Sequence, residues 1–441
     1  MLKQLFEIMG GLLKPSDVSQ VLAEHDCRER RRGGKLPPET TFWLVIQLVL
    51  NRGMSIRSLL AELGLEFGLW AGKPPHSTSV AKARDRLGWR VFRECLRRLR
   101  PENHVQDQWR GKTVLAVDGT CFRAPNSAAN VAALGKPTTS KRTANWPLLR
   151  CVLAIGIRSH WVYDAAFAPY RKWRSDMPVG EAPLSVHMAG RMGKDTLLFL
   201  DRAYCLFSTL RNFLEEDLDF VVRARKSSKG FKPRAFERLK DKTDLVLVRR
   251  KTTGESLVLR RIRFRYKTRR KLTKKIRKGA PYERNRKLKT WTHVTLLTSL
   301  LDPERYPSSE IKELYRQRWE VEHVFKELKT QIGGGEVQFR GQTLTRVLQE
   351  AYATLIAFNG IRSVASAAAA RARVAQVRVS FSLVLTLVRV STKRTVVSRS
   401  AIVSWAAEDG VLPERRDRHY ARTVLARTPK YPVRKPRRLA A

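Results

Sequence analysis

Between residues 113 and 223, short apolar segments alternate with amphipathic ones, and this order restricts the folds that the chain can adopt. The apolar segments end at polar residues, which is typical of buried strands. Amphipathic helices are expected at 184–192 and 206–214, before the fourth and the fifth strand. The order begins β-β-β-α-β and predicts an α/β domain. The strands are expected at 113–117, 151–157, 161–167, 196–200 and 219–223.

Two of these strands deliver an aspartate at their ends, Asp118 after the first and Asp201 after the fourth. A helix expected at 309–331, ended by three consecutive glycines, supplies a third carboxylate. At 100° per residue, one face of this helix combines that carboxylate with cations and aromatic rings, while three other glutamates lie on the far side. The face consists of Tyr315, Arg318, Glu322 and Lys329, within about 60° of one another, and is extended by Trp319 and Lys326.

Two interpretations fit this helix face. Arg318 and Glu322 have the i,i+4 spacing of an ordinary ion pair, worth a few tenths of a kcal/mol. Alternatively, Asp118, Asp201 and Glu322 are three carboxylates from separate segments, which is what two divalent cations require. Mg²⁺ prefers carboxylate, water and phosphate oxygens, and two such ions about 4 Å apart activate a water or a 3′-hydroxyl against a phosphodiester. The separation of one glutamate from the others favours the metal site, with the neighbouring cations holding phosphates.

The charge of the chain points to a polyanionic partner. Its 441 residues include 87 Lys and Arg against 40 Asp and Glu, a net charge of +47, and 43% of them are hydrophobic. That hydrophobic content is enough for the cores of two or three domains. The charge is far above what solubility needs, so DNA or RNA is the first expectation and an anionic membrane surface the second.

Several classes of protein are excluded by the sequence. The five cysteines are scattered without a C-x-x-C pair, which argues against a disulfide framework, a zinc finger or an iron–sulfur site. The N-terminus does not resemble a signal peptide, and the longest apolar stretches are about half the length of a membrane helix. We therefore expect no membrane partner and a cytoplasmic protein, associated with the nucleoid when it is bound to DNA.

Composition divides the chain into five expected parts. The first is expected to be helical, because its apolar residues recur at three- and four-residue spacing, and DNA-binding, because arginines crowd residues 84–100. A β-rich, very basic insertion interrupts the α/β core, and a basic C-terminal region ends in a disordered tail. The expected limits are 1–100 for the helical domain, 101–224 and 292–371 for the two parts of the core, 225–291 for the insertion and 372–441 for the C-terminal region.

The three carboxylates and the helix face resemble those of DDE transposases of the insertion-sequence-four type. The helix reads Tyr-x(2)-Arg-x(3)-Glu-x(6)-Lys from Tyr315 to Lys329, which is the full YREK signature of that group. The block around Asp201, the basic insertion and residues 37–65 extend the resemblance over roughly residues 1–365. It implies an α/β fold with an RNase H-like catalytic core, interrupted by a β-rich insertion domain and preceded by an N-terminal helical domain.

The resemblance also implies an activity. Asp118, Asp201 and Glu322 would hold two Mg²⁺ or Mn²⁺ ions, while Tyr315, Arg318 and Lys329 would contact double-stranded DNA at the transposon end. The enzyme would bind terminal inverted repeats, nick them with an activated water and join the 3′-hydroxyl to target DNA, acting as a dimer in the DNA complex.

One feature of the family is missing from the sequence. The tryptophan that stacks a flipped base in some members corresponds here to Val294, and Trp291 should point to the opposite strand face. Trp319 is an alternative stacking residue, and the sequence does not decide between a hairpin intermediate and another transposition pathway. The rival functions are a decayed copy that only binds DNA and a nuclease with the same core but no strand transfer. An RNA-binding role is disfavoured because no RRM or KH signature is present.

Overall fold

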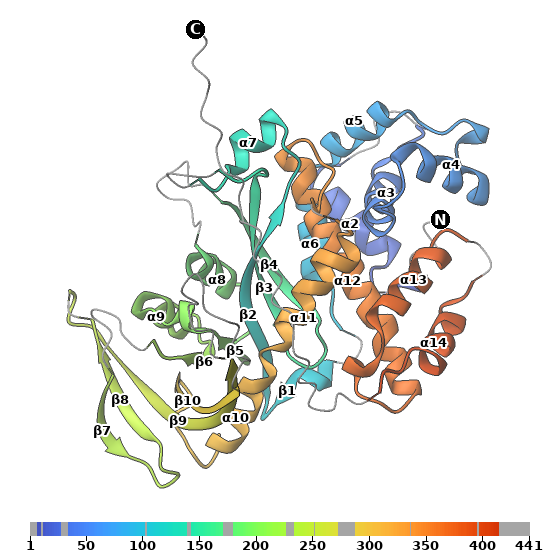
Figure 1. Cartoon of the computed structure of the whole chain (residues 1–441). Coiled ribbons are helices and arrows are strands. Elements are labelled where there is room, and N and C mark those ends of the chain that lie inside the picture. The colour runs from blue at the N-terminus through green and yellow to red at the C-terminus, as the bar shows by residue number, and fades with distance from the viewer. Residues whose placement is uncertain are drawn as a thin grey trace, which may run out of the picture. The chain divides into compact units, whose positions relative to one another are not determined.

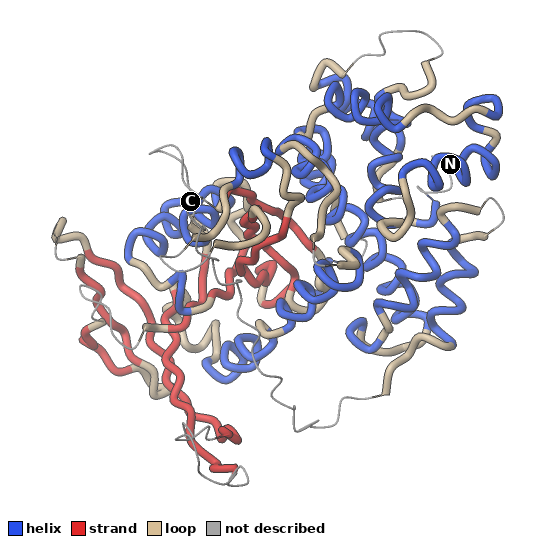
Figure 2. Tube along the Cα trace, turned by 45° about the horizontal axis from the view of Figure 1, so that its top comes forward, coloured by secondary structure: helices blue, strands red, loops and turns tan. Residues whose placement is uncertain are grey.

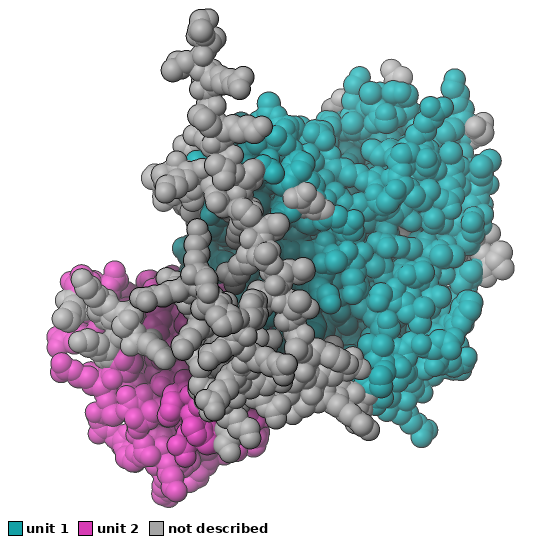
Figure 3. All heavy atoms as spheres, viewed as in Figure 1, with its two compact units in different colours: residues 1–109, 113–188, 319–441 teal, residues 110–112, 189–318 magenta. Residues whose placement is uncertain are grey.

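A computed structural model of the chain divides into two compact units (Figures 1 and 3). Unit 1 comprises residues 1–109, 113–188 and 319–441, and unit 2 comprises 110–112 and 189–318. The residues that the structure describes are 7–9, 12–27, 34–101, 104–138, 143–170, 180–225, 233–250, 252–271, 287–335, 337–394 and 397–413. The expected disordered tail lies outside these residues, as does most of the basic loop of the insertion.

Among the described residues 12–101, the N-terminal part of unit 1 contains five α-helices. Helix α3 starts at a proline, whose fixed φ suits a first helical turn, and every residue from 41 to 50 is buried. The fourth and fifth of these helices are separated at Gly88, which has φ +69°. The five helices are α2 (Pro15–Glu24), α3 (Pro38–Leu50), α4 (Ile56–Phe67), α5 (Ser77–Leu87) and α6 (Arg90–Arg98).

The strands of unit 1 form an antiparallel sheet in the order β4-β3-β2, with β1 pairing β2. Asp118 is in the middle of β2, opposite Leu153, and not at a strand end as expected. The strand continues because its backbone stays paired with β3 as far as Arg123. The strands are β1 (Gln108–Trp109), β2 (Lys112–Arg123), β3 (Leu148–Gly156) and β4 (Val162–Pro169), and the nearby helices are α7 (Ala128–Leu134) and α8 (Glu181–Ala189).

Helix α12 (Leu344–Arg371) forms the centre of unit 1 and packs against α3, α6, α13 (Phe381–Ser391) and α14 (Arg399–Glu408) (Figure 1). By length and composition this helix is apolar enough to cross a membrane, whereas the apolar stretches of the sequence were expected to be too short. However, 83% of its most apolar stretch is buried inside the protein, which is the environment of a core helix.

Unit 2 contains a sheet in the order β5-β6-β10-β9-β8-β7 (strands red in Figure 2). Strands β5 and β6 are parallel and are joined through helix α9, whereas the remaining pairs are antiparallel. Strand β10 pairs with β9 along its whole length and with β6 at its end. It therefore crosses the boundary that was expected between the insertion and the core after residue 291. The elements are β5 (Thr196–Leu200), α9 (Phe207–Glu215), β6 (Asp219–Arg223), β7 (Arg234–Arg238), β8 (Asp244–Arg249), β9 (Ser256–Lys271), β10 (Lys287–Thr298) and α10 (Ser308–Gln317).

The helix expected at 309–331 is not continuous. Helix α10 ends before a turn at residues 318–319, where the chain passes from unit 2 to unit 1. Helix α11 (Glu320–Lys326) follows, and then a π-helical turn, η4 (Glu327–Ile332), closed by the bond from Gly333 N–H to the Leu328 carbonyl. A Cβ at Gly333 would come within 2.5 Å of the Lys329 carbonyl oxygen, so glycine is needed at this position.

Candidate active site

In unit 1, Asp118 is half-buried on β2, and its Oδ1 accepts a hydrogen bond of 2.8 Å from the N–H of Gly119. A Cβ at residue 119 would lie 2.4 Å from the Glu181 side chain, so glycine allows Glu181 to pack against this strand. Glu181 lies before residue 184, where the helix was expected to start, so the sequence pattern did not indicate it as a site residue. A second carboxylate therefore lies beside the strand of Asp118.

Glu322 lies on the solvent-exposed face of α11, whereas Val321 and Val324 are buried. Its neighbour Glu320 faces inward instead, with Oε2 3.3 Å from Nε2 of His160. Burial lowers the pKa of this histidine. The structure therefore separates the two glutamates as the helical periodicity predicted.

The remaining residues of the expected site in unit 1 lie on both sides of Glu322. Trp319 and Lys326 are exposed, and 58% of the surface of Trp319 is accessible to solvent. Lys329 lies in the π-helical turn, with Nζ 5.8 Å from the ring centroid of Phe122 on β2. Burial raises the pKa of Cys121 on the same strand, and the positive charge of Lys329 opposes this increase. Lys329 is thus brought to the strand that carries Asp118.

Unit 2 brings together three other expected residues. Asp201 follows β5 as expected, and its Oδ1 accepts a 2.5 Å hydrogen bond from Ala203 N–H. Tyr315 is only 6% exposed, and its hydroxyl donates to the Leu200 carbonyl at 3.3 Å. The guanidinium of Arg318 lies 5.7 Å from the ring centroid of Tyr315. Burial raises the pKa of Tyr315, the charge of Asp201 raises it further, and the charge of Arg318 opposes both.

Replacing Tyr315 with phenylalanine should lower the free energy of unfolding by about 1 kcal/mol, because the Leu200 carbonyl would lose a buried donor. The affinity for DNA should stay within about threefold of wild type if the hydroxyl serves the protein backbone, since each tenfold change requires 1.4 kcal/mol. Urea unfolding and a DNA-binding titration measure the two quantities. Unchanged stability with much weaker binding would instead place the hydroxyl on the DNA.

The three expected metal ligands are divided between the units, Asp118 and Glu322 in unit 1 and Asp201 in unit 2. Among the residues that the structure describes, no three His, Cys, Asp or Glu side chains form a group that could hold a metal ion. The chemistry of the expected donors nevertheless fits a hard cation, because all three are carboxylates.

Comparisons with known proteins match two transposase family models to this chain. The family "Transposase DDE domain" matches residues 109–359, and "Insertion element 4 transposase N-terminal" matches residues 4–97. The Escherichia coli (strain K12) transposase InsG for insertion sequence element IS4 is 26% identical over 365 residues, covering 80% of this chain and 75% of that protein.

A second E. coli (strain K12) protein, the putative transposase InsZ, is 26% identical over 281 residues, covering 56% of this chain and 90% of that one. Among solved structures, the cryo-EM structure of the piggyBac transposase synaptic complex with hairpin DNA gives a TM-score of 0.43 at 11% identity, covering 95% of this chain and 86% of that one.

Proposed function

The chain belongs to the DDE transposases, since that family matches more than half of its residues, and we propose that Asp118, Asp201 and Glu322 are its catalytic carboxylates. The protein is a DNA transposase, an enzyme that cleaves and transfers DNA strands. The observation that carries the proposal is the family match over 109–359, which includes all three carboxylates and the whole YREK signature. The insertion-sequence-four signature and an RNase H-like core belong to the same proposal.

Elements of both units support the proposed core. Unit 1 contributes the antiparallel strands β2 to β4, and Asp118 lies on β2. Unit 2 contributes the parallel pair β5 and β6 with its α9 crossover, and Asp201 follows β5 directly. Aspartates on and after such strands are suitable ligands for a cation.

The proposed cofactor is a pair of divalent ions, Mg²⁺ or Mn²⁺, held by Asp118, Asp201 and Glu322. When bound, these ions would supply Lewis acidity at the attacking and leaving oxygens of the phosphodiester. The chain itself would hold the DNA. We assign phosphate contacts to Arg318 and Lys329, because a guanidinium binds phosphate in a bidentate manner and an ammonium binds it as a point charge.

Other residues take supporting parts in this proposal. The exposed side chains of Lys326 and Trp319 flank Glu322 and would contact the backbone and a base of the same DNA end. For Tyr315, a phosphate contact would require its hydrogen bond to Leu200 to be exchanged. We further propose that two copies pair the transposon ends, that target DNA is the second substrate, and that the protein acts in the cytoplasm without a membrane partner.

The proposal is tested by cleavage of a duplex that carries the terminal repeat of the element. We expect the wild-type protein to nick the repeat end with Mg²⁺ and not with EDTA, and the Asp118→Ala variant to nick neither way. Binding without nicking by the wild type would indicate a decayed copy. Nicking without joining of the 3′-end to an added target duplex would indicate a nuclease instead.

A further inference from the structure

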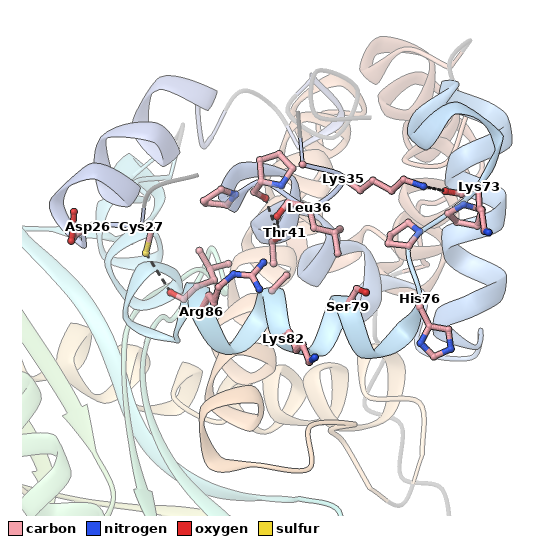
Figure 4. A pocket seen from close by; sticks show the side chains of 17 residues that line it. Asp26, Cys27, Lys35, Leu36, Thr41, Lys73, His76, Ser79, Lys82 and Arg86 are labelled. Carbon is pink, nitrogen blue, oxygen red and sulfur yellow. Dashed lines mark hydrogen bonds between the residues drawn. The ribbon is translucent and has the colours of Figure 1, made fainter. Parts of the chain in front are cut away.

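The N-terminal helices of unit 1 enclose a pocket of about 790 Å³, outside the residues assigned to catalysis (Figure 4). It lies between the beginning of α3, the segment that leads into α5, and α5 itself. Two Pro-Pro pairs, at 37–38 and 74–75, form part of its walls. Because proline has no backbone N–H, this part of the wall offers a ligand no backbone donors. Polar contacts must therefore come chiefly from the side chains around it.

The side chains that line the pocket are predominantly cationic. The lining includes four Lys and Arg residues and one carboxylate, Asp26. Two of the cations, Lys82 and Arg86, are on α5, one helical turn apart, and Ser79 adds a hydroxyl on the same face. The other two are Lys35 and Lys73, and the Lys35 ammonium donates a 2.7 Å hydrogen bond to the Lys73 carbonyl.

Lys82 and Arg86, the two cations that α5 contributes to the pocket, have no acidic partner among the described residues. Lys82 and Arg86 are both exposed, and none of the carboxylates in that part of the structure lies within ion-pair distance of them. Arg84, on the opposite face of the same helix, is buried and bonded to Glu350. The structure thus distinguishes arginines that stabilise the fold from those that are available to a ligand.

The arginine-rich segment 84–100, in which the sequence indicated contact with nucleic acid, is largely used within the protein. Besides Arg84, three of its arginines form ion pairs with glutamates: Arg93 and Arg97 pair with Glu94, and Arg98 pairs with Glu24. An anionic partner would have to compete with these glutamates for the guanidinium groups. The pocket offers cations without that competition.

We propose that this pocket holds the sugar–phosphate backbone of the transposon end, with Lys82 and Arg86 as the main phosphate contacts. This inference depends on the proposed function, which supplies DNA as the ligand. One helical turn of α5 separates the two side chains by about 6 Å along the axis. This is close to two phosphate steps of one DNA strand, each about 3.4 Å along the DNA axis. Contacts of this kind fix the position of the protein on DNA and carry no base sequence.

The test is the salt dependence of DNA binding by the full-length protein. The double variant Lys82→Ala, Arg86→Ala should bind a terminal-repeat duplex about 10- to 100-fold more weakly at low salt, and the slope of log K against log salt should fall by roughly 2. A duplex without the repeat should show the same loss. The charge-preserving variant Lys82→Arg, Arg86→Lys should restore most of the affinity and the slope.

A matched control removes two positive charges from the same domain outside the pocket. Arg57 on α4 and Arg90 on α6 are exposed and do not line it, so Arg57→Ala, Arg90→Ala should change affinity by less than about threefold. If the pocket variant behaved like this control while the wild type bound and cleaved DNA, the pocket proposal would be wrong and the transposase function would stand. If the wild type bound no DNA at all, the function itself would fail.

Discussion

Replacing Glu322 with glutamine should slow metal-dependent cleavage of the transposon end by at least about a thousandfold, which corresponds to about 4 kcal/mol of transition-state stabilisation. An amide is nearly isosteric with the carboxylate but has no negative charge to hold a divalent cation. Because Glu322 is exposed and Val321 and Val324 anchor the other side of α11, the fold and the binding of DNA should change little. Single-turnover cleavage and a binding titration measure the two effects.

The matched control is Glu313→Gln. Glu313 is exposed on α10 and pairs with Arg316 within the same helix. Its loss should change the cleavage rate by less than about twofold, since an exposed pair of this kind contributes only about 0.3–0.5 kcal/mol. Equal rates for the two variants would remove Glu322 from the catalytic centre, and loss of DNA binding by Glu322→Gln would make the residue structural.

The second large effect should come from Glu350 on α12, which is not one of the proposed catalytic residues. Its Oε1 lies 2.8 Å from the Arg84 guanidinium, and the two side chains are only 4% and 5% exposed. Its Oε2 also accepts a 2.6 Å hydrogen bond from the N–H of Arg340. Glu350→Ala would leave a buried cation without its partner, so the free energy of unfolding should fall by about 3–5 kcal/mol.

Asp85→Ala provides the comparison on the same two helices. Asp85 neighbours Arg84 on α5 and pairs with Arg346 on α12, but 46% of its side chain is exposed. Its removal should cost at most about 1 kcal/mol. Urea unfolding followed by circular dichroism, without DNA, compares the two variants. Similar midpoints would show that the buried pair does not hold α5 against α12.

Local sequence pattern predicted most elements well, and its errors have identifiable causes. The apolar strand that leads to Asp118 was correctly located, but its end was placed six residues early, at 117 instead of 123. The pattern becomes polar at Asp118, whereas strand pairing depends on backbone hydrogen bonds to β3 and is indifferent to that change. By contrast, the strand before Asp201 does end where its apolar run ends, because a short helical turn begins there.

Contacts between residues that are distant in the chain could not be predicted from the local sequence pattern. Arg84 and Glu350 are 266 positions apart, so nothing near either residue identified the other. The arginine-rich segment therefore looked like one cationic surface, although four of its seven arginines pair with glutamates. In the same way, the YREK spacing described the order of the residues but not the division of the helix at 318–319.

The π-helical turn η4 has a consequence for which sequence changes this family member can tolerate. A π turn contains one residue more than an α turn, so deleting one residue between 327 and 332 would produce a regular helix at little conformational cost. That deletion would also rotate Lys329 away from Phe122 on β2. Such a deletion would therefore be selected against because it changes the direction of the Lys329 side chain, although the helix itself would still fold.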